Sequence, residues 1–596
     1  MPPFPAPPGV TRRALLTSGA GTAVALAAAT SAGAATSGAG AAANPDLQLL
    51  TSRSGVYTPA RGEAVLQFSF DFPEASVQVG PLLMGFRVQT YENAYAIDPT
   101  VTRVVRDGNR TTLTCDGFLW AGGQEKAPGK LVAEFTVEGD GTVQWTARAE
   151  AQHPVKSITT VARGLPRGEI SVSGQDFTDL KDDEKVFEYP NFFQGMATPL
   201  AVLKTADGRH YALSARQSAV RTCRFFFQPG PDGYRVELIH EGEGWAKSNS
   251  LATPPWRVGP AADYATAAAD HFAHVEKTYG IPKLATRPDM PAWMREVDLV
   301  LSIHGAHWTG YIFNDYARML DILRWAATQI EPKRVMVFLP AWDGRYYWNY
   351  PLYQPDPRMG GVDGFKRLVS QAQKLGFRIV PMFGTNSANK VWEEFKLFAD
   401  ATTERVDGDA FDLNWVDWDN DRSGEGWMPF MNLGVASWRR WLGARISATI
   451  TQFGVDGYFL DIAGAALNNT KADMHEGTRQ LVQDLAQRHP GIPPVGEMLY
   501  DAQMAFIPMS HVTRYTLAPA ACDDHIRNYQ HLSRPAPGRG STGVHEAGFG
   551  TYKTEIPPHQ RAIPTITVVD DTFTKERAAM ADYIRQAKAW GEARRK

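Results

Sequence analysis

The chain has 596 residues, a formal net charge of −3 and three cysteines. A chain of this length is expected to form two or more domains, and it can bury enough apolar surface to fold without disulfide bonds. Because the charge is nearly balanced, it gives no basic surface for nucleic acid, and we expect no nucleic-acid partner.

The N-terminal segment, residues 1–44, has the pattern of a signal peptide followed by a linker. Arg12 and Arg13 precede a short, weakly apolar stretch, and Ala-x-Ala cleavage options follow after Ala34 and Ala43. Adjacent arginines before a mild apolar stretch indicate the twin-arginine route, with an ordinary basic signal as the alternative. No later segment reaches the roughly 20 apolar residues of a membrane span. We therefore expect a secreted, extracellular protein without membrane contact after signal cleavage.

Residues 45–258 are predicted to form an antiparallel β-sandwich. The segments 130–151 and 223–239 alternate apolar and polar residues or are rich in β-branched and aromatic ones, and each contains a hairpin signal, at 138–142 and 229–234. Many strands with almost no helix favour a sandwich.

The cysteines allow one pairing inside this domain. Cys115 and Cys223 both lie in it, so a disulfide between them is one option, whereas Cys522 lies far along the chain. An odd number of cysteines in an exported protein leaves at least one thiol unpaired unless it bridges molecules.

Residues 259–291 are predicted as a helix and a Pro-rich connector. Pro260 at the first turn and Gly280 after the last give the usual Pro-start, Gly-stop pattern of a helix. The connector, 281–291, places the domain boundary before residue 292.

From 292 to 596 the pattern becomes strand, loop and helix in repetition. Eight such units fill the roughly 250 or more residues of a (β/α)₈ TIM barrel, so the whole chain is predicted as a multidomain α+β protein. The runner-up, an open doubly wound sheet, lacks a Gly-rich phosphate turn. The predicted strands are 297–305, 334–342, 377–386, 457–462, 493–499, 511–519, 542–549 and 564–571, and the predicted helices are 315–329, 363–375, 389–400, 437–453, 473–488 and 574–592.

Two carboxylates end neighbouring predicted strands. The apolar segment FGVDGYFLDIAG (453–464) ends its strand on Asp461, and Glu497 ends the next one. A barrel builds its active site at the C-terminal ends of its strands, and two carboxylates there can flank one glycosidic bond. With a period of two, Phe459 and Asp461 share a face, which points Asp461 inward. The alternative is that one or both form ion pairs or caps in ordinary loops.

These two motifs resemble known enzymes. GVDGYFLDI is similar to the fourth-strand motif, and VGEM to the fifth-strand motif, of retaining (β/α)₈ glycoside hydrolases of the α-amylase and endo-α-N-acetylgalactosaminidase type. The resemblance implies that Asp461 is the nucleophile and Glu497 the general acid/base, and an N-terminal β-sandwich fits several secreted members. Where α-amylases carry an Arg, this chain has Phe459, which points away from a starch-type substrate.

Other polar and aromatic residues at predicted strand ends are candidates for binding sugar. Aromatic rings stack on the apolar faces of sugars, and carboxylate, Arg and His side chains bind hydroxyls. About half of the rings are expected simply to pack loops against the barrel. Asp571 is equally well explained as the N-cap of the last predicted helix. Glu546 is an alternative to Glu497 as the general acid. The substrate-binding candidates are His304, Trp308, Trp342, Asp343, Arg345, Trp348, His545, Glu546, Asp570 and Asp571.

The acidic segment 417–425 is a candidate metal site. Asp417, Asp419 and Asp421 alternate, but the sixth and twelfth positions of a helix-loop-helix calcium loop are Arg422 and Met428. An irregular Ca²⁺-binding loop and a solvated acidic loop are both compatible with this pattern. The sequence has no His/Cys cluster of the kind that binds zinc. We therefore predict no metal or cofactor.

The sequence as a whole predicts an exported glycosidase that cleaves a carbohydrate substrate by a retaining two-carboxylate mechanism. The alternatives are a non-catalytic carbohydrate-binding or cell-envelope protein on a barrel scaffold, a transglycosylase, or another barrel enzyme such as a lyase. A binding protein has no need for both Asp461 and Glu497 within reach of one sugar. No oligomeric state is predicted.

Overall fold

A computed structural model describes most of the chain from residue 44 onward, and Asn44–Lys596 clusters as one compact unit. All contacts below lie within this unit. The described ranges are 44–53, 71–120, 123–174, 176–190, 195–231, 233–307, 310–344, 348–411, 428–497, 500–512, 520–530, 561–570 and 572–595.

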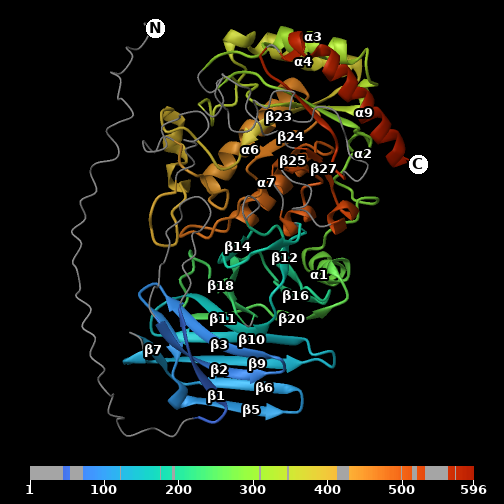
Figure 1. Cartoon of the computed structure of the whole chain (residues 1–596). Coiled ribbons are helices and arrows are strands. Elements are labelled where there is room, and N and C mark those ends of the chain that lie inside the picture. The colour runs from blue at the N-terminus through green and yellow to red at the C-terminus, as the bar shows by residue number, and fades with distance from the viewer. Residues whose placement is uncertain are drawn as a thin grey trace, which may run out of the picture. The chain divides into compact units, whose positions relative to one another are not determined.

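The first half of the described chain forms two antiparallel sheets of ten strands each (Figure 1). The first sheet has the order β14-β17-β18-β11-β3-β4-β7-β8, with β2 paired on β3 and β1 on β2. Its strands are β1 (Leu47–Arg53), β2 (Asp71–Val79), β3 (Leu82–Thr90), β4 (Ala94–Ile97), β7 (Phe118–Trp120), β8 (Glu125–Ala127), β11 (Val155–Leu165), β14 (Lys185–Tyr189), β17 (Cys223–Gly230) and β18 (Gly233–Glu241).

The second sheet has the order β13-β12-β15-β16-β20-β10-β9-β6-β5, with β19 paired on β10. Its strands are β5 (Thr102–Asp107), β6 (Arg110–Cys115), β9 (Gly129–Val137), β10 (Val143–Ala151), β12 (Glu169–Val172), β13 (Thr178–Asp179), β15 (Leu200–Lys204), β16 (His210–Ala215), β19 (Ser250–Ala252) and β20 (Trp256–Ala261). Both predicted hairpins are confirmed, as β9–β10 and β17–β18.

The two sheets contribute side chains to the same hydrophobic core. Phe86 of β3 lies 5.9 Å from Phe135 of β9 between ring centroids, and Phe225 of β17 lies 5.8 Å from Trp256 of β20. Alternation along each strand brings such residues to one face, where their burial is the main stabilising term.

All three cysteines are buried and free, so Cys115 and Cys223 do not form a disulfide. The Cys115 thiol instead donates a hydrogen bond to the carbonyl of Gly117 at 2.8 Å. Burial raises the pKa of the Cys223 thiol well above its usual value. Both thiols therefore act as small core residues.

The helix after the sheets is α1 (Tyr264–Tyr279), and its predicted start at Pro260 is wrong. Pro260 lies in β20, and Asp263 caps the helix by accepting a hydrogen bond from the Thr266 amide at 2.7 Å. Gly280, at a φ of 63°, ends the helix as predicted. The predicted domain boundaries stay predictions, while the structure ends the second sheet at Ala261 and begins the barrel at Leu299.

The second half of the described chain forms an eight-stranded parallel sheet in the order β27-β26-β25-β24-β23-β22-β21-β28. An isolated parallel bridge between Tyr529 and Ile563 brings its two edges together, which makes it a nearly closed barrel. The strands are β21 (Leu299–Ile303), β22 (Val335–Leu339), β23 (Arg378–Gly384), β24 (Tyr458–Asp461), β25 (Pro494–Glu497), β26 (Met509–Val512), β27 (Arg527–Gln530) and β28 (Thr565–Val568).

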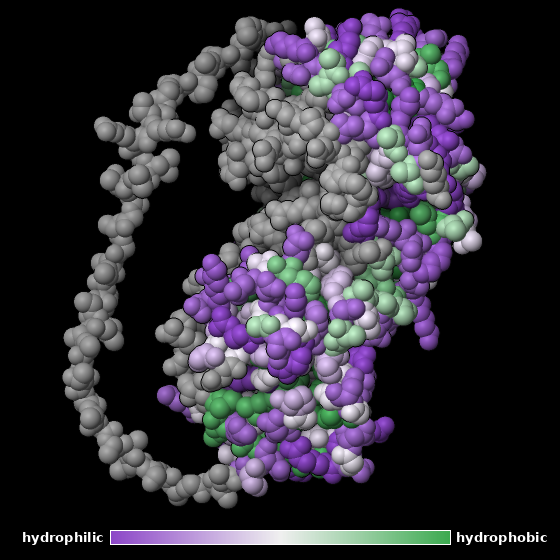
Figure 2. Space-filling model, turned by 45° about the vertical axis from the view of Figure 1, so that its right-hand side comes forward, coloured by the Kyte–Doolittle hydropathy of each residue, from purple (hydrophilic) through white to green (hydrophobic). Residues whose placement is uncertain are grey.

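Most of the predicted barrel helices are confirmed. Figure 1 shows α3 and α4 packed beside each other on the outside of the barrel, where they make extensive contact. The helices are α2 (Ala292–Arg295), α3 (Tyr316–Ala326), α4 (Gly361–Leu375), α6 (Ala436–Phe453), α7 (Met474–Arg488), α8 (Thr572–Lys575) and α9 (Arg577–Arg595). Within the described ranges, no helix is both long and apolar enough to cross a membrane. The residues that Figure 2 colours by hydropathy are mainly hydrophilic on the face shown, as expected when the apolar residues fill the cores.

The helix predicted at 389–400 is instead two short 3₁₀ segments, Glu393–Leu397 and Ala399–Ala401. Phe398 between them has a non-helical backbone and is fully buried. Its ring packs on Trp438 and Trp441 of α6, at centroid distances of 5.0 and 5.4 Å. Tertiary packing at this residue thus overrides the local helical pattern.

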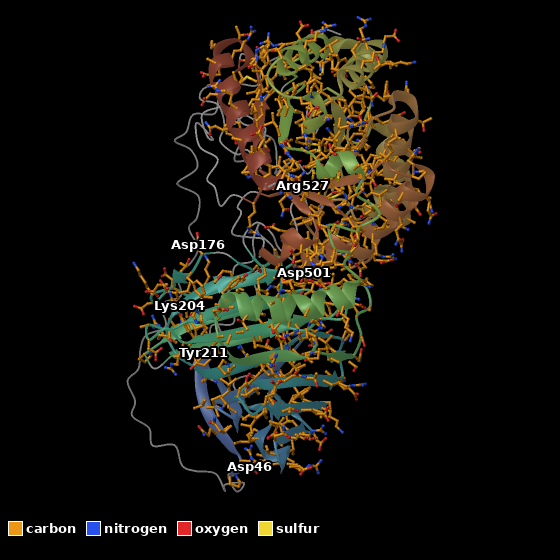
Figure 3. The ribbon with its side chains drawn as sticks, turned by 90° about the vertical axis from the view of Figure 1, so that its right-hand side faces the viewer. Asp46, Asp176, Lys204, Tyr211, Asp501 and Arg527 are labelled. Carbon is orange, nitrogen blue, oxygen red and sulfur yellow. The ribbon has the colours of Figure 1, made fainter. Side chains whose placement is uncertain are left out.

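The seventh strand of the barrel sheet is β27, in a segment where the sequence predicts no strand. β27 pairs with β26, with Met509 opposite Arg527. Arg527 is buried and donates hydrogen bonds to the carbonyls of Met294 and Arg295 at 3.0 and 2.8 Å. Figure 3 labels it on the barrel. Residues 542–549 lie outside the described part of the chain.

Candidate active site

Aromatic rings from well-separated strands meet inside the barrel. Phe459 of β24 lies 4.4 Å from Phe338 of β22, and Phe338 lies 6.5 Å from Tyr529 of β27. Because β22 and β27 are not neighbours in the sheet, these rings can meet only across the barrel interior. Phe459 therefore points inward, and alternation places Asp461, two residues later, on the same interior face.

Asp461 is the last residue of β24, with 1 % of its surface exposed. It lies opposite Gly384 at the end of β23, and its carbonyl accepts a hydrogen bond from the Thr385 amide at 3.3 Å. The hydrophobic strand thus fixes a carboxylate at the C-terminal mouth of the barrel, which is where barrel active sites form.

Glu497 ends the neighbouring strand, β25, and is 3 % exposed. Leu460 pairs with Gly496, so the next residues, Asp461 and Glu497, are level neighbours on strands about 4.8 Å apart. The backbone N–H of Ile462 donates a hydrogen bond to Oε2 of Glu497 at 2.7 Å. This bond turns the Glu497 carboxylate toward the end of β24, beside Asp461.

Two further interior residues, His511 and Tyr529, lie level with Glu497 on the next strands. Nε2 of His511 is 3.8 Å from Oε1 of Glu497. Burial raises the pKa of Tyr529 well above its usual value, and the charges of Glu497 and Asp461 raise it further. The Tyr529 hydroxyl is buried and has no hydrogen-bond partner among the described residues.

Neither residue is among the candidates predicted from the sequence. His511 begins a predicted strand, and Tyr529 lies in β27, where the sequence predicts no strand. Alternation of inward and outward side chains along a predicted strand could have indicated that Tyr529 points into the barrel. No strand is predicted at β27, so this signal is lacking.

Asp343, four residues after the end of β22, is another buried acid on the barrel. Burial raises its pKa to about 7, and the nearby charge of Asp356 adds to the shift. Its Oδ2 has no hydrogen-bond partner among the described residues. Burial raises the pKa of Tyr353 well above its usual value, and the charges of Asp343 and Asp461 raise it further. The Tyr353 hydroxyl donates to the carbonyl of Gly384 at 3.1 Å and accepts from its amide at 2.9 Å.

Trp342 lies in the hydrophobic core. Its ring is buried there, so it is not available to stack on a sugar as the sequence predicts. Its ring is fully buried and stacks on Phe365 of α4 at 4.7 Å, and its indole N–H donates to the carbonyl of Met382 at 2.9 Å. The residue therefore fills the core between the barrel strands and α4.

Three other predicted binding residues lie in the described chain, two of them just after barrel strands. His304, just after β21, is buried against Phe313, and burial lowers its pKa well below the usual value. Asp570, after β28, accepts a hydrogen bond from the Tyr311 hydroxyl at 2.8 Å. Trp348 is half-buried, and its carbonyl accepts from the Trp392 indole at 2.8 Å. None of these contacts reaches Asp461 or Glu497, so the binding roles stay predictions.

Other predicted residues lie outside the described part of the chain: Trp308, Arg345, the acidic segment at 417–425, His545, Glu546 and Asp571. Within the described ranges, no group of three or more His, Cys, Asp or Glu side chains is arranged to hold a metal ion.

The fold is similar to that of the alpha-N-acetylgalactosaminidase NagBb from Bifidobacterium bifidum. The GalNAc complex of that protein matches with a TM-score of 0.62 at 12% sequence identity, over 87% of this chain and 93% of that chain. The ligand-free form has the same TM-score and identity over 90% and 93%, and a quadruple mutant has a TM-score of 0.60 at 12% identity over 88% and 89%. No family model and no curated protein matches the sequence. At this identity the likeness shows a shared fold, which spans both antiparallel sheets and the barrel.

Proposed function

We propose that the protein is a glycosidase that cleaves a carbohydrate substrate with Asp461 and Glu497. The observation that carries this proposal is the placement of the two buried carboxylates on level, neighbouring strand ends, with Glu497 held toward Asp461 by the Ile462 amide. A pair of carboxylates on either side of one bond is what glycoside hydrolysis requires. The likeness to an alpha-N-acetylgalactosaminidase is in keeping with this chemistry.

The proposed mechanism is retaining. Level neighbours on adjacent strands favour the short separation, about 5–5.5 Å, that lets one carboxylate attack the anomeric carbon directly. Asp461 is the nucleophile. Glu497 protonates the leaving oxygen and then, as a carboxylate, takes a proton from the attacking water. Tyr529 lies level with Glu497, two strands away, and its hydroxyl, which has no hydrogen-bond partner in the described part of the chain, can bind a substrate oxygen.

The first substrate to test is 4-nitrophenyl α-N-acetylgalactosaminide, because the structural neighbour acts on that sugar. A panel of other α- and β-linked aryl glycosides follows. The comparison is between the wild-type protein and Asp461→Asn, with Asp456→Asn as the matched control. Asp456 precedes the same strand and accepts a hydrogen bond from the Ile379 amide at 2.9 Å, at the end of the barrel away from the site.

The proposal expects wild-type turnover on at least one glycoside, loss of that turnover in Asp461→Asn, and retention in Asp456→Asn. A wild-type protein that binds sugars but cleaves none of them would favour the carbohydrate-binding alternative. Transfer of the sugar to an added alcohol in preference to water would favour the transglycosylase.

Two further parts of the proposal concern the rest of the chain. The paired arginines, Arg12 and Arg13, support export by the twin-arginine route and an extracellular location. The shared core of the two antiparallel sheets supports the predicted β-sandwich.

A further inference from the structure

The loop that follows the Glu497 strand is anchored through Asp501 to the two antiparallel sheets (β1–β20), which together are called the first domain below. This carboxylate is fully buried at the start of the 3₁₀ segment Asp501–Ala505. Its Oδ1 accepts a hydrogen bond from the Tyr189 hydroxyl at 2.6 Å, and its Oδ2 accepts from the Thr198 hydroxyl at 2.7 Å. The Asp501 amide also donates to the carbonyl of Ala197 at 2.8 Å. Figure 3 shows Asp501 above the long helix α1.

The anchor continues into α1. Nε2 of His271 lies 2.7 Å from the Thr198 hydroxyl oxygen. Because that hydroxyl donates its proton to Asp501, its oxygen is left to accept from the Nε2–H of His271. All of these side chains are buried, so the hydrogen bonds form in a low-dielectric region where a broken bond is costly. The position of Asp501 is therefore tightly fixed.

The same loop also reaches the end of the nucleophile strand. Gln503 donates a side-chain hydrogen bond to the carbonyl of Ala463, two residues after Asp461. The amide of Gly464 in turn donates to the carbonyl of Glu497 at 2.9 Å. The anchored segment thus lies four residues from Glu497 along the chain and is hydrogen-bonded to the backbone that follows Asp461.

A second set of contacts from the first domain holds the loop after Asp461. Arg221 forms an ion pair with Asp473 at 3.1 Å. The side chain of Asn468 accepts from the Gly244 amide at 2.9 Å and donates to the carbonyl of Gly242 at 2.8 Å. The first domain therefore contacts both loops that follow the two carboxylate strands.

We propose that Tyr189 and Thr198 are positioning residues that, through Asp501, hold Glu497 in the geometry needed for proton transfer. This inference rests on the proposed function. Catalytic groups must be held to within about 0.5 Å of their productive position, and a displacement of about 1 Å can lower a rate about 10²-fold. The first domain thereby completes an active site whose carboxylates all lie on the barrel.

The test compares Tyr189→Phe with Tyr234→Phe. Each substitution removes one tyrosine hydroxyl from the first domain, but the Tyr234 hydroxyl donates to the Gly168 carbonyl at 2.8 Å, within that domain and away from the barrel. For each variant, kcat/KM is measured on a 4-nitrophenyl glycoside and on the corresponding phenyl glycoside. The phenyl leaving group depends more on protonation by Glu497.

Tyr189→Phe should lower kcat/KM on the phenyl glycoside about tenfold or more, and clearly less on the 4-nitrophenyl glycoside. Tyr234→Phe should leave kcat/KM unchanged on both substrates. Equal losses on both substrates, or wild-type values for Tyr189→Phe, would overturn the inference, because a purely structural role does not distinguish leaving groups. If Tyr189→Phe does not fold, Thr198→Val removes the other hydroxyl from Asp501 and is measured in the same way.

A structural measurement separates this inference from the proposed function. Crystal structures of the wild-type protein and Tyr189→Phe should show the Glu497 carboxylate displaced and its hydrogen bond to the Ile462 amide lengthened in the variant. If Glu497 has the same position in both crystal structures, Tyr189 does not position it, even if the wild-type protein is an active glycosidase. A wild-type protein that cleaves no glycoside would count against the proposed function, whatever the two crystal structures show of Glu497.

Discussion

The backbone N–H of Ile462 donates a hydrogen bond to the Glu497 carboxylate at 2.7 Å, although Ile462 has a φ of 54°. A β-branched residue in the left-handed region is strained by about 1–2 kcal/mol. Burial of its side chain with Phe411, Phe430 and Met474 offsets this strain. The strained turn aims the amide of the residue after Asp461 at Glu497, and so connects the two proposed catalytic groups.

The first prediction concerns Glu497 itself. Glu497→Gln keeps an oxygen that can accept from the Ile462 amide, so the fold should be retained. The variant cannot donate a carboxylic proton, and kcat/KM on glycosides with poor leaving groups should fall about 10²–10⁴-fold. The fall on 4-nitrophenyl glycosides should be much smaller. A uniform loss across leaving groups, measured on purified variants, would contradict the role of acid.

The second prediction concerns the pH dependence of stability at Asp343. Its pKa is raised from 3.8 to about 7 by burial, so the folded state binds a proton more tightly than the unfolded state. The resulting stabilisation is complete below about pH 4 and is lost as the pH rises from 4 to 7. Asp343→Asn is neutral throughout, so its stability relative to the wild type should increase by about 2–3 kcal/mol between pH 5 and pH 8.

Unfolding by urea at pH 5 and pH 8 measures this difference. Asp484→Asn is the control, because Asp484 is exposed on α7 and far from the buried acids. Equal stability differences for Asp343→Asn at the two pH values would show that Asp343 does not titrate as proposed.

The third prediction concerns the dependence of the barrel on the first domain. In a chain that begins at Pro291, removal of α1 exposes Met504, Cys522 and Ile526, and Asp501 loses its partners Tyr189 and Thr198. Loss of burial costs about 25 cal/mol per Å² of apolar surface. The shortened chain should therefore aggregate or lack activity, as judged by size-exclusion chromatography and glycoside assays. A monodisperse barrel with full activity would show that the first domain is dispensable.

The sequence predicted the parts of the fold whose periodicity is strong and local. The strand ending in Asp461 is continuous and apolar, and α6 and α7 have clear helical spacing, so each was placed to within a few residues. The level alignment of Asp461 and Glu497 followed from their places at the ends of successive barrel strands.

The errors arose where long-range contacts decide the structure. β27 has a charged first residue, Arg527, which is buried only because the carbonyls of α2 accept its hydrogen bonds. Trp342 has the composition of a sugar-stacking residue, but packing with Phe365 buries it. The anchor at Asp501 joins residues about 300 positions apart, which no local pattern can indicate.

The fourth prediction concerns export. Replacement of Arg12 and Arg13 by Lys should leave the precursor in the cytoplasm if the twin-arginine route is used. Immunoblots of cell fractions measure this. Normal export of the double variant would contradict the routing and leave the extracellular location to a general signal.

The most direct test of the central claim is ¹H NMR of the product first formed from a glycoside that the wild-type protein cleaves. Attack by Asp461 and a second displacement by water activated by Glu497 predict that this product has the same anomeric configuration as the substrate. If the anomer of the first product is inverted, Asp461 does not form a glycosyl intermediate, and the assignment of the two carboxylates is wrong.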